Sequence, residues 1–357
     1  MSDPTTTTRP AGDVDLRARL RGARLPRWAP YAAGAAAVVL AFLLAMVTGI
    51  EGWGGTATVA VLLFLVGLTS WSFLVEGRRH AVDRLATTLV YATFVIAVVP
   101  LVAVLFSVIQ RGISALNLQF LVNDMRNVSP RAVGGGIAHA LVGTIEQVLI
   151  ATVIAVPIGV LAAIYLVEYG GGRLAKAVSF FVDVMTGVPS IVAGLFVYTG
   201  LVLTLGLDRS GFAAALSLVV LMIPVITRTT EEMLKIVPND LREASYALGV
   251  PKWRTILRVV IPTALGGIVT GVMLAVARVA GETAPLLLTT FLSQNMNWNP
   301  FSGPQASLPL FVWSQIGYGT DAAIARAWAG ALVLILFVVV MYVSAKLVAR
   351  RFAPKAR

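Results

Sequence analysis

The sequence contains no cysteine and only two histidines, His80 and His139. The absence of cysteine excludes disulfides, thiolate metal sites and a cysteine nucleophile. Two histidines are too few for a histidine metal cluster, so we expect no metal site. The pattern Gly-x-x-x-x-Gly-Lys-Ser/Thr is absent as well, so the chain has no P-loop to hold nucleotide phosphates. We therefore expect no cofactor on this chain, and any ATP to be used by a separate polypeptide.

Charge is also scarce. Only 13% of the 357 residues are charged and 58% are hydrophobic, with a mean hydropathy of +0.86. A soluble domain keeps about a quarter of its residues charged. The apolar runs are continuous rather than alternating, and about 20 such residues span a bilayer as a helix. The composition predicts an all-α polytopic membrane protein.

Eight apolar stretches are long enough to be spans. They are Ala29–Ile50, Thr56–Val75, Leu85–Ile109, Ala138–Leu166, Phe180–Leu205, Phe212–Ile226, Gly267–Thr290 and Ala323–Val348. The first two look like an added hairpin. We therefore expect three parts: a disordered cytoplasmic tail (1–28), an extra hairpin with a basic loop (29–84) and a larger domain (85–357).

The basic residues are unevenly distributed among the segments between the spans. With the N-terminus inside, cytoplasmic segments hold 22 of the 28 Lys and Arg residues. This bias follows the positive-inside rule and predicts a multi-pass protein of the cytoplasmic (inner) cell membrane with both termini cytoplasmic. It also explains the net charge of +11 without nucleic acid as a partner. Two long loops, 110–136 and 291–321, are then exterior.

The cytoplasmic segment 228–262 has a helix–break–helix pattern. Pro238-Asn239-Asp240 predicts a turn before a helix that ends at Gly249, and Pro251 opens a second short helix. Two such helices could be passive elements at the membrane surface, and spacing alone leaves that alternative about even.

The residue identities favour a specific role. Glu243-Ala244-Ser245, Gly249 and Val259-Val260-Ile261-Pro262 stand at the spacing of the EAA loop that the permeases of ATP-binding-cassette (ABC) importers share, which this segment resembles. The resemblance implies that Glu243, Ala244, Ser245, Gly249 and Pro262 belong to a loop that docks on a separate ATPase subunit. Glu243 could otherwise be only a solvated acid near a helix N-terminus.

Three further segments narrow the family. They begin at Ala140, Thr186 and Ala277, and the last contains Gly281-Glu282-Thr283-Ala284-Pro285-Leu286. Together they resemble the A-type permease subunit of phosphate-specific ABC importers over about residues 85–347. That resemblance implies a type I (MetI-like) permease core. It also implies three partners, namely a C-type sister permease, a dimeric ATP-binding subunit and an extracytoplasmic phosphate-binding protein, besides membrane lipid.

Charged residues within spans are candidates for the translocation pathway. Arg278 and Glu282 are four residues apart, which predicts one face near the middle of the seventh span. Arg suits an oxyanion because its planar donors are permanently charged. The alternative is an ion pair within the helix that only offsets a burial cost. Glu146 could line the pathway or bond a neighbouring helix.

Five other residues are weaker candidates. We expect Asp183 and His139 near the interfaces and Gly187, Gly194 and Gly200 at close helix contacts.

Three alternative functions stay open. The same class of importer could carry another oxyanion such as sulfate, molybdate or phosphonate. An ion-driven carrier could use Glu146 or Glu282 for protons, although it has no need of a docking loop. A membrane-embedded enzyme would need clustered acids, bases or metal ligands, and no motif for them occurs.

Overall fold

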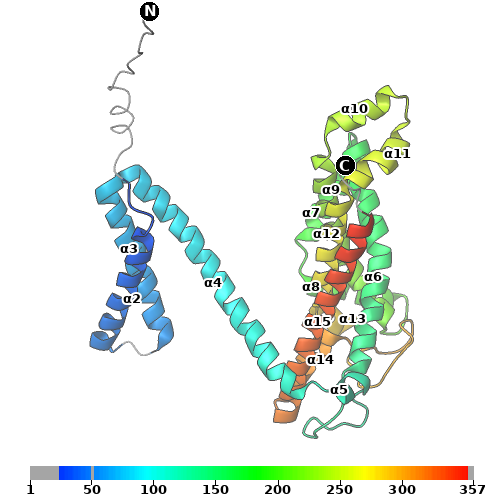
Figure 1. The fold of residues 1–357 in the computed structure, drawn as a ribbon. Coiled ribbons are helices and arrows are strands. Elements are labelled where there is room, and N and C mark those ends of the chain that lie inside the picture. The colour runs from blue at the N-terminus through cyan, green and yellow to red at the C-terminus, as the bar shows by residue number, and fades with distance from the viewer. Residues whose placement is uncertain (1–23, 50–51, 353–357) are drawn as a thin grey trace, which may run out of the picture. The chain divides into compact units, whose positions relative to one another are not determined.

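A computed structural model describes residues 24–49 and 52–352, and every regular element in these ranges is helical (Figure 1). The all-α prediction is confirmed. Of the predicted tail, residues 1–23 lie outside the described residues. The chain divides into two compact units, and the boundary along the sequence falls between Leu105 and Phe106.

Seven described helices are long and apolar enough to cross a membrane, and a bent helix pair gives an eighth candidate. The seven are Ala29–Thr48, Gly54–Glu76, Arg78–Ala115, Ala138–Tyr169, Gly211–Ile236, Lys252–Ala280 and Asp321–Leu347. Each of the seven overlaps one predicted span, but several ends differ.

The N-terminal unit is the predicted hairpin followed by the first part of a long helix. Its helices are α2 (Ala29–Thr48), α3 (Trp53–Glu76) and α4 (Arg78–Ala115). Small alanines on one face of α2 let it pack on α3. The stretch 76–84, predicted as a basic loop, is helical apart from Gly77, whose φ of +87° separates α3 from α4.

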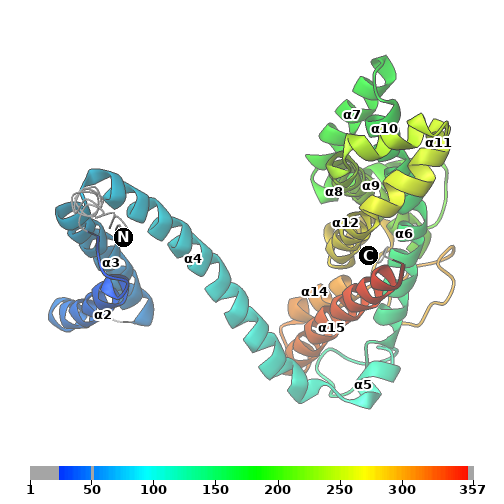
Figure 2. The ribbon, with the colours of Figure 1, turned by 45° about the horizontal axis from the view of Figure 1, so that its top comes forward.

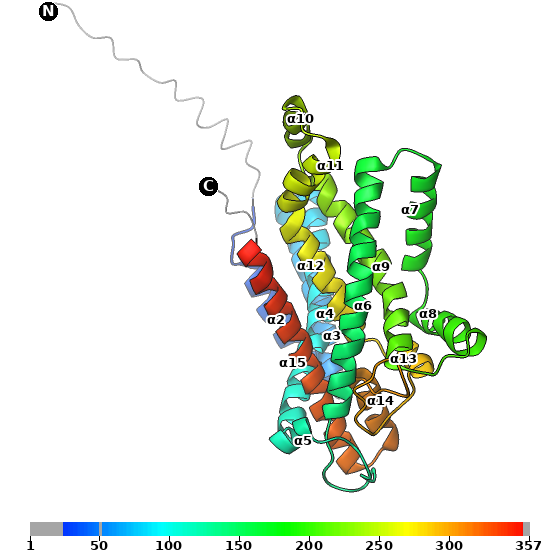
Figure 3. The ribbon, with the colours of Figure 1, turned by 90° about the vertical axis from the view of Figure 1, so that its right-hand side faces the viewer.

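In the larger unit, α6 (Ala138–Ile164), α9 (Gly211–Ile236), α12 (Ile261–Ala280) and α15 (Asp321–Phe352) run side by side (Figure 3). Helix α9 is central, with 67% of its most apolar stretch buried. Small residues let its neighbours approach closely, because a Cβ at Gly159 would lie 2.8 Å from Ile226 and one at Gly271 would lie 2.4 Å from Thr229.

The predicted fifth span, Phe180–Leu205, is wrong as a single helix. Helix α7 (Arg173–Thr186) stops before Gly187. The chain then bends by 109°, and a second helix follows that consists of α8 (Ser190–Val197) and η2 (Tyr198–Thr204) (Figures 2 and 3). Pro189 lacks an N–H and disfavours helix at the residue before it. The Thr186–Phe196 segment therefore contains the sharp bend between the two helices.

The sixth and seventh spans also differ from prediction. Helix α9 continues ten residues beyond the predicted end at Ile226, with Pro224 inside it. The expected short second helix of the 228–262 segment is continuous with the next span. It consists of α11 (Lys252–Thr255), η3 (Ile256–Val260) and α12, which together form one helix, Lys252–Ala280. The chain then breaks before α13 (Ala284–Thr289).

The two loops predicted as exterior contain short helices, α5 (Leu118–Val122) and α14 (Leu308–Tyr318). Both begin at a side-chain cap, where Asn117 accepts from the Phe120 N–H and Ser307 accepts from the Leu310 N–H. These loops lie at the opposite end of the unit from α10 (Asn239–Ala247) (Figure 1).

The glycines of the bent pair give a matched test of helix packing. A Cβ at Gly194 would lie 2.5 Å from the Pro285 Cα, whereas a Cβ at Gly200 meets nothing within 4 Å. We expect Gly194→Ala to lower the free energy of unfolding by roughly 1–3 kcal/mol through overpacking and Gly200→Ala to leave it unchanged. Melting temperatures of the purified variants in detergent measure this, and equal values would contradict the close α8–α13 contact.

Candidate functional site

Helix α10 protrudes at one end of the larger unit and exposes most of its surface (Figure 1). Glu243 and Ala244 are exposed, and Leu248 is 83% exposed. Leu241 and Tyr246 add further exposed apolar area. A short helix that leaves such residues uncovered within its own chain has the composition of a docking surface.

The turn after α10 is fixed by Gly249. Its φ is +72°, a left-handed conformation that favours glycine. The Gly249 N–H donates to the Tyr246 carbonyl and the Val250 N–H to the Ser245 carbonyl. These two bonds form a Schellman motif, which ends the helix and sets the direction of the chain toward Pro251.

Ser245 has a different position from its neighbours in the predicted docking loop. It is buried, and its hydroxyl lies 2.8 Å from the Thr255 hydroxyl, across the turn. Ser245 therefore holds α10 against the next helix. Pro262 is half-buried in the first turn of α12, also away from the exposed face of α10.

A buried ion pair anchors α10 to the end of α6. Arg242 donates through Nε and one terminal nitrogen to the Glu168 carboxylate at 3.1 and 3.0 Å. Its other bonds go to the Leu234 and Val237 carbonyls and to the side-chain oxygen of Asn239. The Glu168 side chain, in η1 (Tyr165–Tyr169), is only 5% exposed. Lys252 donates to the Glu168 backbone carbonyl and lies over the Tyr169 ring. The exposed helix thus has a rigid attachment.

We expect Glu168→Gln to lower the free energy of unfolding by about 3 kcal/mol, since it leaves Arg242 without its counter-charge in a largely buried place. Glu243→Gln, the same change on the exposed face of α10, is the control and should change it by less than about 0.5 kcal/mol. Chemical unfolding of both purified variants measures the difference. Equal midpoints would show that the pair contributes nothing to the anchor.

The predicted pathway pair is not on one helix. Helix α12 ends at Ala280, and Glu282 lies in the break before α13, so the expected shared helix face is wrong. Arg278 is exposed and lies near the C-terminal end of α12, not in the middle of a span, while Glu282 is half-buried. Among the described residues no ion pair joins the two.

Glu146 lies apart from that break in the hydrogen-bond network of α6. Its carboxylate accepts from Gln305 Nε2 at 2.5 Å. Gln305 is buried, accepts from Gln147 and contacts Thr290 through its backbone, so it is the hub that fixes the 291–307 loop. The structure brings no two of the three predicted pathway residues into hydrogen-bonding contact within the part of the chain it describes.

Arg228 is a hub that the sequence did not single out. It donates to Asp183 and to Ser179 on α7, and also to Glu231 on its own helix α9. Asp183 is therefore an ion-pair partner that ties the bent pair to α9, not only an interfacial residue. Two other expectations are settled as well. His139 lies in the first turn of α6, at the end of a span as expected, but its side chain is 2% exposed and packs against Phe311. Gly194 is a close contact as predicted.

Comparison with known proteins agrees with this geometry. Residues 155–354 match the family described as "Binding-protein-dependent transport system inner membrane component". The chain is 47% identical over 272 residues to a protein of Mycobacterium tuberculosis (strain CDC 1551 / Oshkosh) named "Phosphate transport system permease protein PstA 1", covering 76% of this chain and 90% of that protein. A Yersinia pestis protein named "Phosphate transport system permease protein PstA" is 40% identical over 275 residues, covering 76% and 92%.

Solved structures support the fold. A chain of a bacterial alginate ABC transporter, solved with an alginate-bound periplasmic protein, superposes with a TM-score of 0.56 at 14% identity, covering 77% of this chain and 97% of that one. A second alginate importer structure gives 0.52 at 15% identity, with 78% and 100% covered. The family match and the relatives of 40–47% identity, together with the apolar helices, show a multi-pass membrane protein that is a transport subunit and not an enzyme. The chain belongs to the family of binding-protein-dependent transport system inner membrane components.

Proposed function

We propose that this chain is the A-type permease subunit of an ABC importer that translocates inorganic phosphate across the cytoplasmic membrane by alternating access. The observation that carries the importer assignment is α10, an exposed helix at the spacing of the EAA loop that is anchored by Arg242 and Glu168. Phosphate as the substrate is supported by relatives of 37–47% identity that are named for phosphate transport.

The anchored helix gives a mechanical route from ATPase to substrate. Force applied to α10 would reach α6 through the Arg242–Glu168 pair and α12 through the Gly249 turn. The helix that begins at Lys252 carries Arg278 close to its other end. At 1.5 Å per residue, Lys252 and Arg278 are about 40 Å apart along this helix, a distance that exceeds the thickness of the bilayer core. Movement at one membrane face would therefore move Arg278 near the other.

Arg278 and Glu282 would act at the helix break that follows α12. An exposed, permanently charged guanidinium on a membrane helix needs a partner outside this chain, and an oxyanion in a pathway shared with a sister permease is such a partner. Glu282, in non-helical backbone, would balance the charge so that the anion can leave. Glu146, through Gln305, would place the 291–307 loop at the edge of this pathway.

The proposal includes three partners and an orientation. A C-type sister permease completes the pathway, a dimeric ATP-binding subunit docks on α10 and uses the ATP, and an extracytoplasmic phosphate-binding protein delivers substrate. With α10 cytoplasmic, the α5 and α14 loops face outward to receive it. The distribution of Lys and Arg supports this orientation.

The proposal is tested by ATP hydrolysis of the four-subunit complex in vesicles. We expect the binding protein loaded with phosphate to stimulate hydrolysis, and the empty or sulfate-treated binding protein not to do so. Stimulation by sulfate alone would contradict phosphate as the substrate. A complex that does not form with this chain would contradict the permease assignment.

Single cysteines test the orientation, since the chain has none of its own. Labelling needs exposed positions in the two loops proposed to face outward. Arg126 and Ser302 are exposed and suit this purpose, whereas Gln305 in the same loop as Ser302 is only 1% exposed. In intact cells we expect membrane-impermeant thiol reagents to label Arg126→Cys and Ser302→Cys, and to label Arg79→Cys and Leu248→Cys only after permeabilisation. The reverse pattern would invert the proposed topology.

A further inference from the structure

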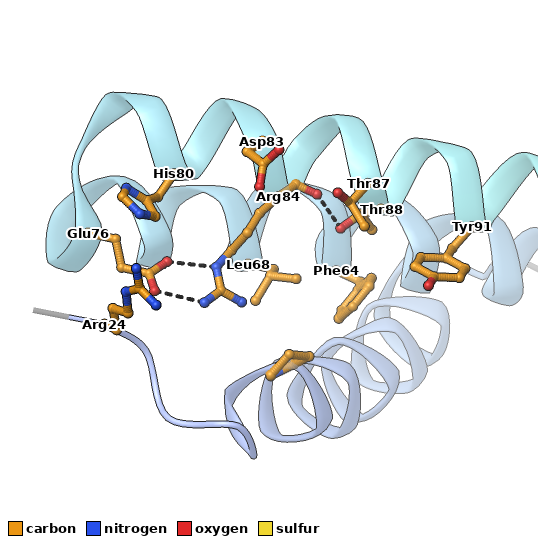
Figure 4. A pocket seen from close by; sticks show the side chains of 11 residues that line it. Arg24, Phe64, Leu68, Glu76, His80, Asp83, Arg84, Thr87, Thr88 and Tyr91 are labelled. Carbon is orange, nitrogen blue, oxygen red and sulfur yellow. Dashed lines mark hydrogen bonds and ion pairs between the residues drawn. The ribbon is translucent and has the colours of Figure 1, made fainter.

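The N-terminal unit contains a groove of about 710 Å³ that the transport mechanism does not use (Figure 4). Its walls come from α2, α3 and α4, together with the segment before α2. The lining residues are Arg24, Pro30, Phe64, Leu68, Glu76, His80, Asp83, Arg84, Thr87, Thr88 and Tyr91. The groove lies wholly inside the unit that ends at Leu105.

The polar end of the groove is built around the Glu76 carboxylate, which is 2% exposed. It accepts from Arg84 Nε and Nη2 at 2.6 and 2.8 Å (Figure 4). It also accepts from the Ser72 hydroxyl and from the Leu25 backbone N–H. The bond to Leu25 holds the preceding residue, Arg24, beside the groove. Because Glu76 occupies only one edge of the Arg84 guanidinium, the remaining N–H groups of Arg84 stay available.

Every described Asp, Glu, Lys and Arg of this unit lies at that same end. Five are basic (Arg24, Arg27, Arg78, Arg79, Arg84) and two are acidic (Glu76, Asp83). Trp28 and Trp71 meet there edge to face, with ring centroids 6.1 Å apart. Aromatic rings beside a cluster of arginines are typical of the membrane–water interface, where anionic headgroups lie.

The other end of the groove is apolar. Phe64 precedes Glu76 by 12 residues on α3, and Tyr91 follows Arg84 by seven on α4. At 1.5 Å per residue these rings lie about 18 and 10 Å along the helices from the polar end, at the depth of acyl chains. The groove thus combines a cationic head with an apolar body in the order that a phospholipid presents.

We propose that this groove binds one anionic phospholipid, with its phosphate held by Arg24 and Arg84 and its acyl chain along Phe64 and Leu68. Glu76 is neutralised by Arg84, so the excess charge at the head comes from Arg24 and the neighbouring arginines. Asp83 also lines the groove and opposes an anion, but the unit's charged groups still sum to a positive excess. Charge complementarity therefore selects an anionic over a zwitterionic headgroup.

The test uses the full-length chain reconstituted in vesicles of equal parts phosphatidylglycerol and phosphatidylcholine, re-extracted in mild detergent, with the retained lipid quantified by mass. We expect phosphatidylglycerol to be retained in preference to phosphatidylcholine. Arg24→Gln should lower its retention about fivefold, the effect of one basic residue near an anionic surface. Thr87→Trp should lower it as well by filling the groove, because Thr87 is an exposed lining residue.

Two matched variants are the controls. Arg173→Gln removes an exposed arginine from α7, and Thr93→Trp adds the same bulk to α4 outside the groove. Both should retain phosphatidylglycerol like the parent. Equal retention of the two lipids by the parent, or equal retention by Arg24→Gln and Arg173→Gln, would overturn the proposal. So would a Thr87→Trp variant that retains lipid like the parent but no longer copurifies with the sister subunit when the two are produced together, since a protein segment would then fill the groove.

Discussion

Arg278→Gln is expected to abolish phosphate uptake while the assembled complex survives. Arg278 is exposed on α12 with no ion-pair partner recorded among the described residues, so its loss removes no contact within the chain. Losing a desolvated charge that meets an anion costs about 2–5 kcal/mol, which is roughly 30-fold to several thousand-fold in uptake. Arg278→Lys keeps the charge but loses the planar fork and should retain partial activity at most.

The double variant Arg278→Gln/Glu282→Gln separates this role from a structural one. If the two residues only compensated one another, neutralising both would restore folding and transport. The helix break between them predicts that the double variant stays inactive at normal complex yield. Uptake and yield are measured together in proteoliposomes, with Arg173→Gln as a control on an exposed arginine of α7. Restored transport would refute the pathway role.

Gly249→Pro is expected to uncouple ATP hydrolysis from transport. Proline fixes φ near −65°, whereas Gly249 has a φ of +72° and donates its N–H to Tyr246. The substitution would turn α10 away from its anchored direction. Gly249→Asn is the matched control, because asparagine tolerates the left-handed conformation and keeps the donor.

Glu243→Arg probes the same surface through charge instead of shape. Glu243 is exposed, and its side chain has no ion pair or hydrogen bond within the described chain, so folding should be unaffected. We expect uptake to fall at least about tenfold, equivalent to about 1.4 kcal/mol of docking free energy, while Glu232→Arg on the exposed side of α9 has no such effect. Normal ATP-driven uptake by Gly249→Pro and Glu243→Arg together would show that α10 is not the docking helix.

The sequence was sufficient to predict the helical class, the positions of most spans and the stop that follows α10. The length of each apolar run predicts a membrane span, and a glycine such as Gly249 predicts the end of a helix. The continuous helix beyond Pro251 could not be predicted the same way. Pro262 would normally end a helix, but the π-helical turn Ile256–Val260 precedes it and absorbs the change in hydrogen bonding, with the Ile261 N–H bonded to the Ile256 carbonyl.

The errors at the candidate site share one cause. Hydropathy measures apolar content and does not detect a bend, so Phe180–Leu205 and Gly267–Thr290 were both interpreted as single helices. Val188-Pro189 and Gly281 with Pro285 were the available signals of a break. The four-residue spacing of Arg278 and Glu282 has structural meaning only on an unbroken helix.

Long-range pairs were beyond reach for a different reason. Glu168 and Arg242 are 74 residues apart, and Asp183 and Arg228 are 45 apart. From the sequence alone, each of these four charged residues could simply be exposed to solvent. Only the packing of α6, α7 and α9 brings the partners together, and that packing decides which charges anchor α10.

Uptake by the reconstituted importer tests the central claim most directly. This chain, its sister permease, the ATPase and the binding protein are placed in sealed vesicles, and radiolabelled phosphate and sulfate are supplied separately with or without internal ATP. The account predicts accumulation of phosphate that requires ATP and is unaffected by collapsing the proton gradient, with no accumulation of sulfate. ATP-independent uptake driven by the proton gradient, or uptake of sulfate in place of phosphate, would contradict it.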